Sequence, residues 1–183
     1  MPWTATDIPD QSGRTYVITG ANSGLGAVTA RALGARGAEV ILACRNTAKA
    51  EPVAADIGER AQIRKLDLAD LESVRAFAAE TGPTDVLINN AGIMAVPKRR
   101  TADGFEMQIG TNHLGHFALT NLMLPRIRER VVTLSSGAHR ARTANPSWVS
   151  NAESKSASAS VLASLSAFSN RVRSTGFSQQ PCT

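Results

Sequence analysis

The sequence contains little cysteine and no long hydrophobic segment. Its 183 residues include two cysteines, Cys44 in an apolar run and Cys182 near the C-terminus, which argues against a disulfide framework and for a reducing compartment. No apolar run approaches the roughly 18 residues of a membrane-spanning helix. Residues 1–10 lack the apolar core of a signal peptide. We therefore expect a cytoplasmic protein without a membrane span.

Aromatic residues are also scarce, at 4% of the chain, and positive charge is spread thinly. The net charge of +5 requires a nucleic-acid partner to be considered, but the densest basic cluster, Lys98-Arg99-Arg100, has no aromatic neighbours. Surfaces that bind nucleic acid combine basic residues with stacking aromatics. We interpret the basic residues as a solvated surface and expect no nucleic-acid partner.

The sequence offers no set of metal ligands. His113 and His116 lie in a segment of helical period without a third donor at a suitable spacing. We expect no metal site, and for these two histidines no role beyond packing or exposure.

Short β-branched runs alternate with longer segments of helical period, an order typical of βαβ units. The expected strands are residues 15–19, 39–43, 62–66, 86–89 and 131–134. The first, second and fourth read as apolar runs, as in a sheet covered on both faces. Three helices are expected. The first starts at Gly24 and turns an inner face toward the sheet, with Leu25, Val28, Ala32 and Leu33 on it. The second spans 71–79, and the third spans 103–124, with Phe105, Ile109, Phe117 and Leu124 among its apolar positions. The predicted fold is α/β, a Rossmann-type doubly wound parallel sheet whose C-terminal strands are incomplete.

A glycine-rich turn, Thr19-Gly20-Ala21-Asn22-Ser23-Gly24-Leu25-Gly26, joins the first expected strand to the first expected helix. One glycine permits a tight reversal, one lets the backbone approach a phosphate, and one lets the helix pack against the strand. The N–H groups and dipole of the helix start then face a pyrophosphate. Such a turn can be purely structural, but this one has the preceding strand and following helix that a dinucleotide site requires. We predict that it binds a dinucleotide cofactor.

Arg45 follows the second expected strand, where dinucleotide-binding folds contact the adenosine ribose. An acid there accepts from the 2′-hydroxyl of NAD, whereas an arginine pairs with the 2′-phosphate of NADP. Arg45 therefore favours NADP(H) over NAD(H). The alternative is an ordinary solvated arginine at a strand end.

The composition of the chain changes near Thr143. Residues 144–183 are rich in serine and poor in charge, with a weak helical stripe from Ala157 to Val172. We expect an N-terminal extension over residues 1–12, a dinucleotide-binding domain over 13–143, and an atypical tail over 144–183 with one helix at most.

Four further motifs follow the glycine turn in order. They are Asp67-Leu68, Asn89-Asn90-Ala91-Gly92, Asn112 within residues 111–117, and Ser135-Ser136 after the fifth expected strand. Taken singly, Asp67 is also consistent with a helix cap and residues 89–92 with a turn. Together the five motifs resemble the short-chain dehydrogenases/reductases over about residues 13 to 140. Within that family they are most similar to the branch of retinol dehydrogenases and bacterial relatives.

The resemblance implies hydride transfer between a nicotinamide cofactor and a carbonyl or alcohol carbon of a small, lipophilic substrate. It implies that Asp67 contacts the adenine amine, that Asn112 holds the water of a proton relay, and that Ser136 polarises the substrate oxygen. The predicted cofactor-binding residues are Gly20, Asn22, Ser23, Gly24, Leu25, Gly26, Arg45, Asp67, Leu68, Asn89, Ala91 and Gly92. The predicted catalytic residues are Ser136, Asn112 and Lys155.

The family's acid–base tyrosine, with a lysine four residues later, has no counterpart here. The single tyrosine, Tyr16, lies in the first expected strand, and no Tyr-x-x-x-Lys follows Ser136. The nearest similarity is residues 151–155, which start with Asn151, whose amide does not titrate, and end with Lys155. Lys155 is either the family lysine or a lysine of a polar tail. We hypothesise that a frame change or internal deletion in the gene truncated the family sequence.

Three functions remain open. The first is an NADP(H)-dependent oxidoreductase of impaired activity, because acid–base assistance contributes about 10²–10⁴-fold to rate. The second is a catalytically silent NADP(H)-binding module, alone or paired with a full-length relative through the helix over 103–124. The third is a nonfunctional product, because a parallel sheet without its last strands exposes an edge. The resemblance also implies a homo-oligomer.

Overall fold

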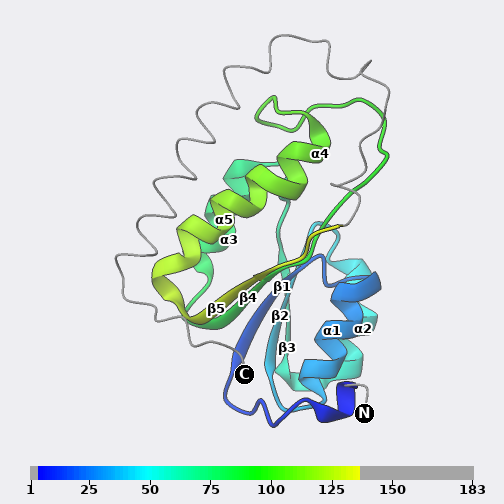
Figure 1. The fold of residues 1–183 in the computed structure, drawn as a ribbon, viewed down its shortest axis with the longest axis vertical. Helices are drawn as coiled ribbons and strands as arrows, with labels where there is room; N and C mark the ends of the chain where they lie inside the picture. The colour runs from blue at the N-terminus through cyan, green and yellow to red at the C-terminus, as the bar shows by residue number, and fades with distance from the viewer. Residues whose placement is uncertain (1–3, 137–183) are drawn as a thin grey trace, which may run out of the picture. The chain divides into compact units, whose positions relative to one another are not determined.

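Five parallel strands form one sheet in the order β3-β2-β1-β4-β5 (Figure 1). The computed structural model describes residues 4–136. The strands are β1 (Thr15–Thr19), β2 (Glu39–Cys44), β3 (Ala61–Lys65), β4 (Thr84–Asn89) and β5 (Ile127–Thr133). The chain proceeds outward from β1 to β2 and β3, then returns to the other side of β1 with β4 and β5. This is the doubly wound order with its switch point between β1 and β4, and it confirms the predicted Rossmann-type α/β fold.

Helices cover both faces of the sheet. They are α1 (Gly24–Gly34), α2 (Glu51–Ile57), α3 (Leu71–Glu80), α4 (Met107–Ile109) and α5 (Gly115–Met123), with a π-helical turn at Gly110–Leu114 joining the last two. Short 3-10 segments lie at Ala5–Asp7, Ala48–Ala50, Gly58–Arg60 and Leu124–Arg126. Figure 1 shows α1 and α2 against one face, and α3 and α5 against the other.

Two hydrophobic cores lie on the two faces of the sheet. In β1, Tyr16 and Ile18 pack in the core beneath α1 and α2, whereas Val17 packs in the core that includes Phe77 of α3 and Leu119 of α5. Successive strand residues point to opposite faces. Because β1, β2 and β4 are covered on both sides, their central residues form apolar runs that are buried without alternation, as the sequence indicated.

The inner face of α1 differs from the expectation. Leu25 and Val28 are 70% and 62% exposed, whereas Ala27, Ala30 and Leu33 are buried. Small side chains on the inner face let α1 approach the sheet closely, so the large apolar residues of its first turns point outward.

The expected helix over 103–124 also differs. It begins at Met107, after a cap in which the Glu106 carboxylate accepts hydrogen bonds from the Ile109 and Gln108 N–H groups at 2.8 and 2.9 Å. Two of the four expected apolar positions are wrong, since Ile109 is 51% and Leu124 38% exposed, and Leu119 and Met123 are buried instead. The π-helical turn inserts an extra residue and rotates the buried face of everything after it.

Other boundaries shift by small amounts, and α2 was not predicted. The strand β5 begins at Ile127, four residues earlier than expected, because Arg128 and Arg130 interrupt its apolar pattern. Among residues 4–136, no helix is long and apolar enough to cross a membrane, and no group of three or more His, Cys, Asp or Glu is placed to hold a metal ion. The predicted tail helix and Lys155 lie outside the described residues.

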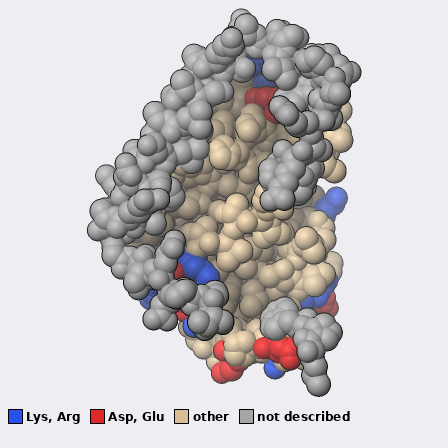
Figure 2. Space-filling model, viewed as in Figure 1, with Lys and Arg blue, Asp and Glu red and all other residues tan. Residues whose placement is uncertain are grey.

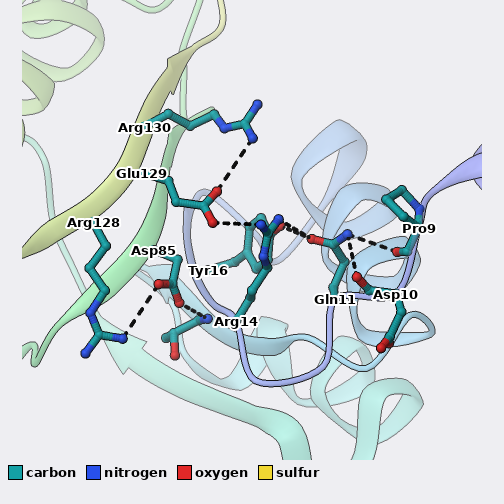
Figure 3. Close-up of polar contacts among 10 residues, drawn as sticks. Pro9, Asp10, Gln11, Arg14, Tyr16, Asp85, Arg128, Glu129 and Arg130 are labelled. Atoms are coloured by element: carbon teal, nitrogen blue, oxygen red, sulfur yellow. Dashed lines mark hydrogen bonds and ion pairs between the residues drawn. The ribbon is translucent and has the colours of Figure 1, made fainter. Parts of the chain in front are cut away.

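A polar network ties the amino-terminal segment to β1, β4 and β5 (Figure 3). Asp85 accepts a hydrogen bond from Thr15 N at 2.7 Å, and Arg14 pairs with Glu129 at 2.8 Å. The Tyr16 hydroxyl donates to the buried side chain of Gln11. The only tyrosine of the chain is therefore part of this structural network.

Candidate functional site

A groove of about 430 Å³ lies at the carboxyl ends of the strands, at the switch point between β1 and β4. It is lined by the last two residues of β2, by residues that follow the first four strands, and by Thr111 and Leu134. The first two groups are Gly20, Asn22, Ser23, Gly24, Leu25, Ala43, Cys44, Arg45, Leu66, Asp67, Leu68, Asn90, Ala91, Gly92 and Ile93. Open α/β sheets bind their ligands in this crevice.

The three glycines of the turn after β1 have three different surroundings. Gly20 has φ +66°, and a Cβ there would lie 2.9 Å from the Ala91 Cα. A Cβ on Gly26 would lie 2.5 Å from Asn90 Nδ2 and 2.6 Å from the Gly20 carbonyl oxygen, so this glycine lets α1 pack against the strand ends. Gly24 has φ +53°, and a Cβ there would meet nothing within 4 Å. Gly24 therefore presents bare backbone to the groove, as the predicted approach of a phosphate requires.

The start of α1 suits an anion. Ser23 is the N-cap residue by its backbone, but among the described residues its side chain makes no capping hydrogen bond. The first-turn N–H groups of this 11-residue helix thus remain directed at the groove, with the positive end of the helix dipole. A pyrophosphate fits this arrangement of donors.

Arg45 and Asp67 stand on the part of the groove formed by β2 and β3. Arg45 is exposed and, within residues 4–136, forms no ion pair. The Asp67 carboxylate accepts from Ala69 N at 2.9 Å and shapes the turn after β3. Asp67 is not the cap of α3, because Asp70 holds that position and accepts from Glu72 N at 2.9 Å.

The loop after β4 is bonded to the end of β1. The Thr19 hydroxyl accepts hydrogen bonds from Asn90 N and Ala91 N, each at 2.9 Å, and Asn90 Nδ2 donates to the Thr19 carbonyl at 2.8 Å. Asn89 is buried beneath this loop and donates to Thr120 Oγ1 at 2.9 Å. These bonds hold the backbone of residues 90–92 along the groove wall.

Asn112 lies in the π-helical turn and clamps the same loop. Its Nδ2 donates to the Ile93 carbonyl at 2.7 Å, and its Oδ1 accepts from Ile93 N at 2.8 Å. The side chain is therefore engaged by the loop, which leaves the main-chain carbonyl of Asn112 for other partners.

His116 has a polar role that the sequence did not predict. It is 5% exposed, with Nε2 2.9 Å from Thr19 Oγ1 and Nδ1 3.0 Å from the Asn112 carbonyl oxygen. Burial lowers the pKa of His116, so the ring is held neutral. Its position four residues after Asn112, one helical turn away, was the available signal.

Some predicted residues lie apart from the groove lining. Gly26 and Asn89 do not line the groove but pack or bond against residues that do. Asn112 also lies outside the lining and contacts it through its hydrogen bond with Ile93 N. Ser136 is exposed and comes three residues after the end of β5, whereas Lys155 lies outside the described residues. Sequence reasoning missed the contributions of Ala43, Cys44, Leu66, Ile93, Thr111 and Leu134. Burial raises the pKa of the Cys44 thiol, whose sulfur donates to the Asn46 carbonyl at 3.4 Å.

A doubly wound parallel sheet with a glycine turn and an open helix start at its switch point defines the Rossmann class of dinucleotide-binding proteins. Within that class, the chain belongs to the short chain dehydrogenase family, whose model matches residues 14–171. The match extends beyond the change in composition near Thr143 and includes Lys155.

Three relatives illustrate the similarity. Human retinol dehydrogenase 11 is 51% identical over 140 residues, which are 69% of this chain and 44% of that protein. The crystal structure of an uncharacterised protein from Mycobacterium Paratuberculosis is 57% identical, with a TM-score of 0.74 over 85% of this chain and 62% of the other. A metagenomic short-chain oxidoreductase solved in complex with NADP is 33% identical, with a TM-score of 0.59 over 69% of this chain and 63% of the other. The chain thus spans less than half of the human protein's length.

Proposed function

We propose that this chain binds NADP(H) in the groove at the switch point and acts as an oxidoreductase on a small carbonyl or alcohol compound. The observation that carries the proposal is the groove itself, in which the bare backbone of Gly24, the open start of α1 and the exposed Arg45 face one space. The solved relative that contains NADP supports the choice of cofactor.

Different residues of the groove would contact different parts of the cofactor. The first-turn N–H groups of α1 would hold the pyrophosphate, and the Arg45 guanidinium would pair with the 2′-phosphate. Asp67, whose carboxylate already accepts from Ala69 N, offers its second oxygen to the adenine amine. The backbone of residues 90–92, held by Thr19, forms the wall beside the remainder of the cofactor.

The reacting end combines the cofactor's chemistry with two protein groups. When bound, the nicotinamide cofactor would supply or accept a hydride. By the family resemblance, Ser136 would polarise the substrate oxygen. The Asn112 carbonyl accepts from a water molecule that carries a proton to or from that oxygen.

A second function, cofactor binding without efficient turnover, is favoured by the position of Tyr16. This only tyrosine lies inside β1 and donates its hydroxyl to buried Gln11, so it does not serve the groove. Without a phenol for proton transfer, we expect a rate about 10²–10⁴-fold below that of an intact acid–base pair.

The two functions are separated by one pair of measurements on the whole chain. Calorimetric titration with NADPH and NADH tests binding, and loss of NADPH absorbance with a panel of aldehydes and ketones tests turnover. Binding with turnover supports the oxidoreductase, and binding without turnover supports the module. A folded chain that binds neither nucleotide would refute both.

A further inference from the structure

The Thr19 hydroxyl lies at a buried junction of three elements. It accepts two hydrogen bonds, from Asn90 N and Ala91 N, both at 2.9 Å. A hydroxyl oxygen has two lone pairs and one proton, so these two donors use its whole accepting capacity. Its proton then goes to His116 Nε2 at 2.9 Å, which is a shorter contact than the 3.4 Å to the Ile88 carbonyl.

The hydrogen bond of His116 Nδ1 indicates independently that Nε2 is the accepting nitrogen. Nδ1 lies 3.0 Å from the Asn112 carbonyl oxygen, which can only accept, so Nδ1 carries the proton. A neutral imidazole has one N–H, which leaves Nε2 as the acceptor for Thr19. Both contacts therefore select a single tautomer, and burial keeps the ring neutral by lowering the pKa of His116.

We propose that His116 is a positioning residue: through its Nδ1–H tautomer it couples the Thr19 hydroxyl, which holds the loop after β4, to the main-chain carbonyl of Asn112 in the π-helical turn. Thr19 and His116 are 97 residues apart in the chain, so this bond joins the end of β1 to the start of α5. The chain of hydrogen bonds has one direction, from the loop N–H groups through Thr19 and His116 to Asn112. Each member fixes the donor or acceptor role of the next.

These hydrogen bonds fix the orientation of the loop after β4 relative to the π-helical turn beside the groove. The Asn112 side chain clamps Ile93, and its carbonyl is held by His116, so the π-helical turn has no freedom to rotate away from the loop. The inference that this geometry serves a bound nucleotide rests on the proposed function, whereas the tautomer and the coupling do not.

The first test reads the tautomer directly in the ligand-free chain. Nitrogen-15 NMR of histidine-labelled protein separates protonated from unprotonated ring nitrogens, and a His116→Asn variant assigns the signals among the three histidines. We expect a neutral His116 ring with its proton on Nδ1 at pH 7. A proton on Nε2, or an averaged signal from exchanging tautomers, would overturn the proposal.

The second test uses three variants and the NADPH dissociation constant. His116→Asn keeps a donor near Nδ1, His116→Gln keeps an acceptor near Nε2, and His116→Phe keeps only the ring. Positioning predicts that Phe raises the dissociation constant most, by about 10-fold, with Asn and Gln between Phe and the native residue. If the imidazole only fills space, Phe is the best tolerated of the three, and that order would contradict the proposal. His113→Gln is the matched control.

The two proposals fail in different ways. If the native chain binds no NADPH, the proposed function fails. The amide signals of Asn90 and Ala91 then still report the coupling, since His116→Phe should shift both while His113→Gln shifts neither. Unshifted amides in a folded His116→Phe variant would refute the coupling itself.

Discussion

At the scale of single residues, Arg45 has the clearest consequence for ligand choice. It stands exposed at the end of β2, lines the groove, and forms no ion pair with the rest of residues 4–136. A guanidinium in that position is available to a phosphate and gives nothing specific to a ribose hydroxyl.

Arg45→Asp should therefore weaken NADPH binding by about 10- to 100-fold, the value of charge-assisted hydrogen bonds, and weaken NADH binding much less. Calorimetric titration of both nucleotides measures the change. Arg75→Asp, which makes the same change of charge on an exposed part of α3 outside the groove, is the control. An unchanged ratio of the two affinities in Arg45→Asp would show that Arg45 does not select the cofactor.

His116 gives the chain a pH dependence of stability. Its pKa in the folded chain lies below the ordinary value of 6.5, first because of burial and also because of the charge of His113, while the Asn112 bond opposes the shift. Below that ordinary value the unfolded chain binds a proton that the folded chain resists, so the free energy of unfolding falls as pH falls. Above it, both states are neutral and this contribution is constant.

Urea unfolding at several pH values between about 7.5 and 5.5 tests this dependence. The native chain should lose more stability over that range than His116→Asn, which has no ring to titrate. His113→Gln should keep most of the native slope, because burial, the largest cause of the His116 shift, is unchanged. Parallel pH profiles for the native chain and His116→Asn would contradict a buried neutral imidazole.

At the scale of elements, the segment from α4 through α5 depends on a glycine at close approach. A Cβ on Gly115 would collide with the Leu68 carbonyl oxygen, and Leu68 lines the groove after β3. The π-helical turn before Gly115 brings the start of α5 against that loop. The shape of the groove therefore depends on the position of α5.

Gly115→Ala should cost about 1–3 kcal/mol of stability, as expected for an added methyl group in a packed contact, and should weaken NADPH binding by moving Leu68. Urea unfolding and calorimetry measure the two effects. Gly82→Ala, where the added Cβ meets nothing within 4 Å, should leave both nearly unchanged. Equal stability of the two variants would mean that α5 moves aside without cost.

The elements also show why the sequence predicted one part of the site and not another. The glycine turn and Arg45 were predictable because each directly follows a strand, and parallel strands all end at the same edge of the sheet. Asp67 was predicted from the family resemblance. The bond of His116 to Thr19 spans 97 residues, which no periodicity encodes. The buried face of α5 was misplaced because a π-helical turn has no hydrophobic signature of its own, so a uniform 3.6-residue period loses its phase at Gly110.

At the scale of the whole described region, the polar network that ties the amino-terminal segment to β1, β4 and β5 lies at the opposite end of the strands from the groove. Asp85 and Glu129 act near the amino ends of β4 and β5 (Figure 3), whereas the groove follows the carboxyl ends of β1 to β4. On the face that Figure 2 shows, the described surface is largely uncharged, with Lys, Arg, Asp and Glu toward its margins. Stability and ligand binding can therefore be changed separately.

Asp85→Ala leaves the Thr15 N–H without its carboxylate acceptor and should cost about 1–3 kcal/mol, with the NADPH dissociation constant unchanged in the folded chain. Asp56→Ala removes an exposed ion pair with Arg31 and should cost at most about 1 kcal/mol. Thermal unfolding with calorimetric titration below the transition measures both quantities. A weaker affinity in folded Asp85→Ala would show that the two ends are coupled.

The central claim is that the groove at the switch point is an NADP(H) site. Titration of the whole chain with NADPH by isothermal calorimetry tests it most directly. The account predicts saturable binding at one site per chain, tighter than for NADH, and weakened when Arg45 is replaced by aspartate. A chain that is folded by circular dichroism and produces no heat of binding with NADPH would contradict it.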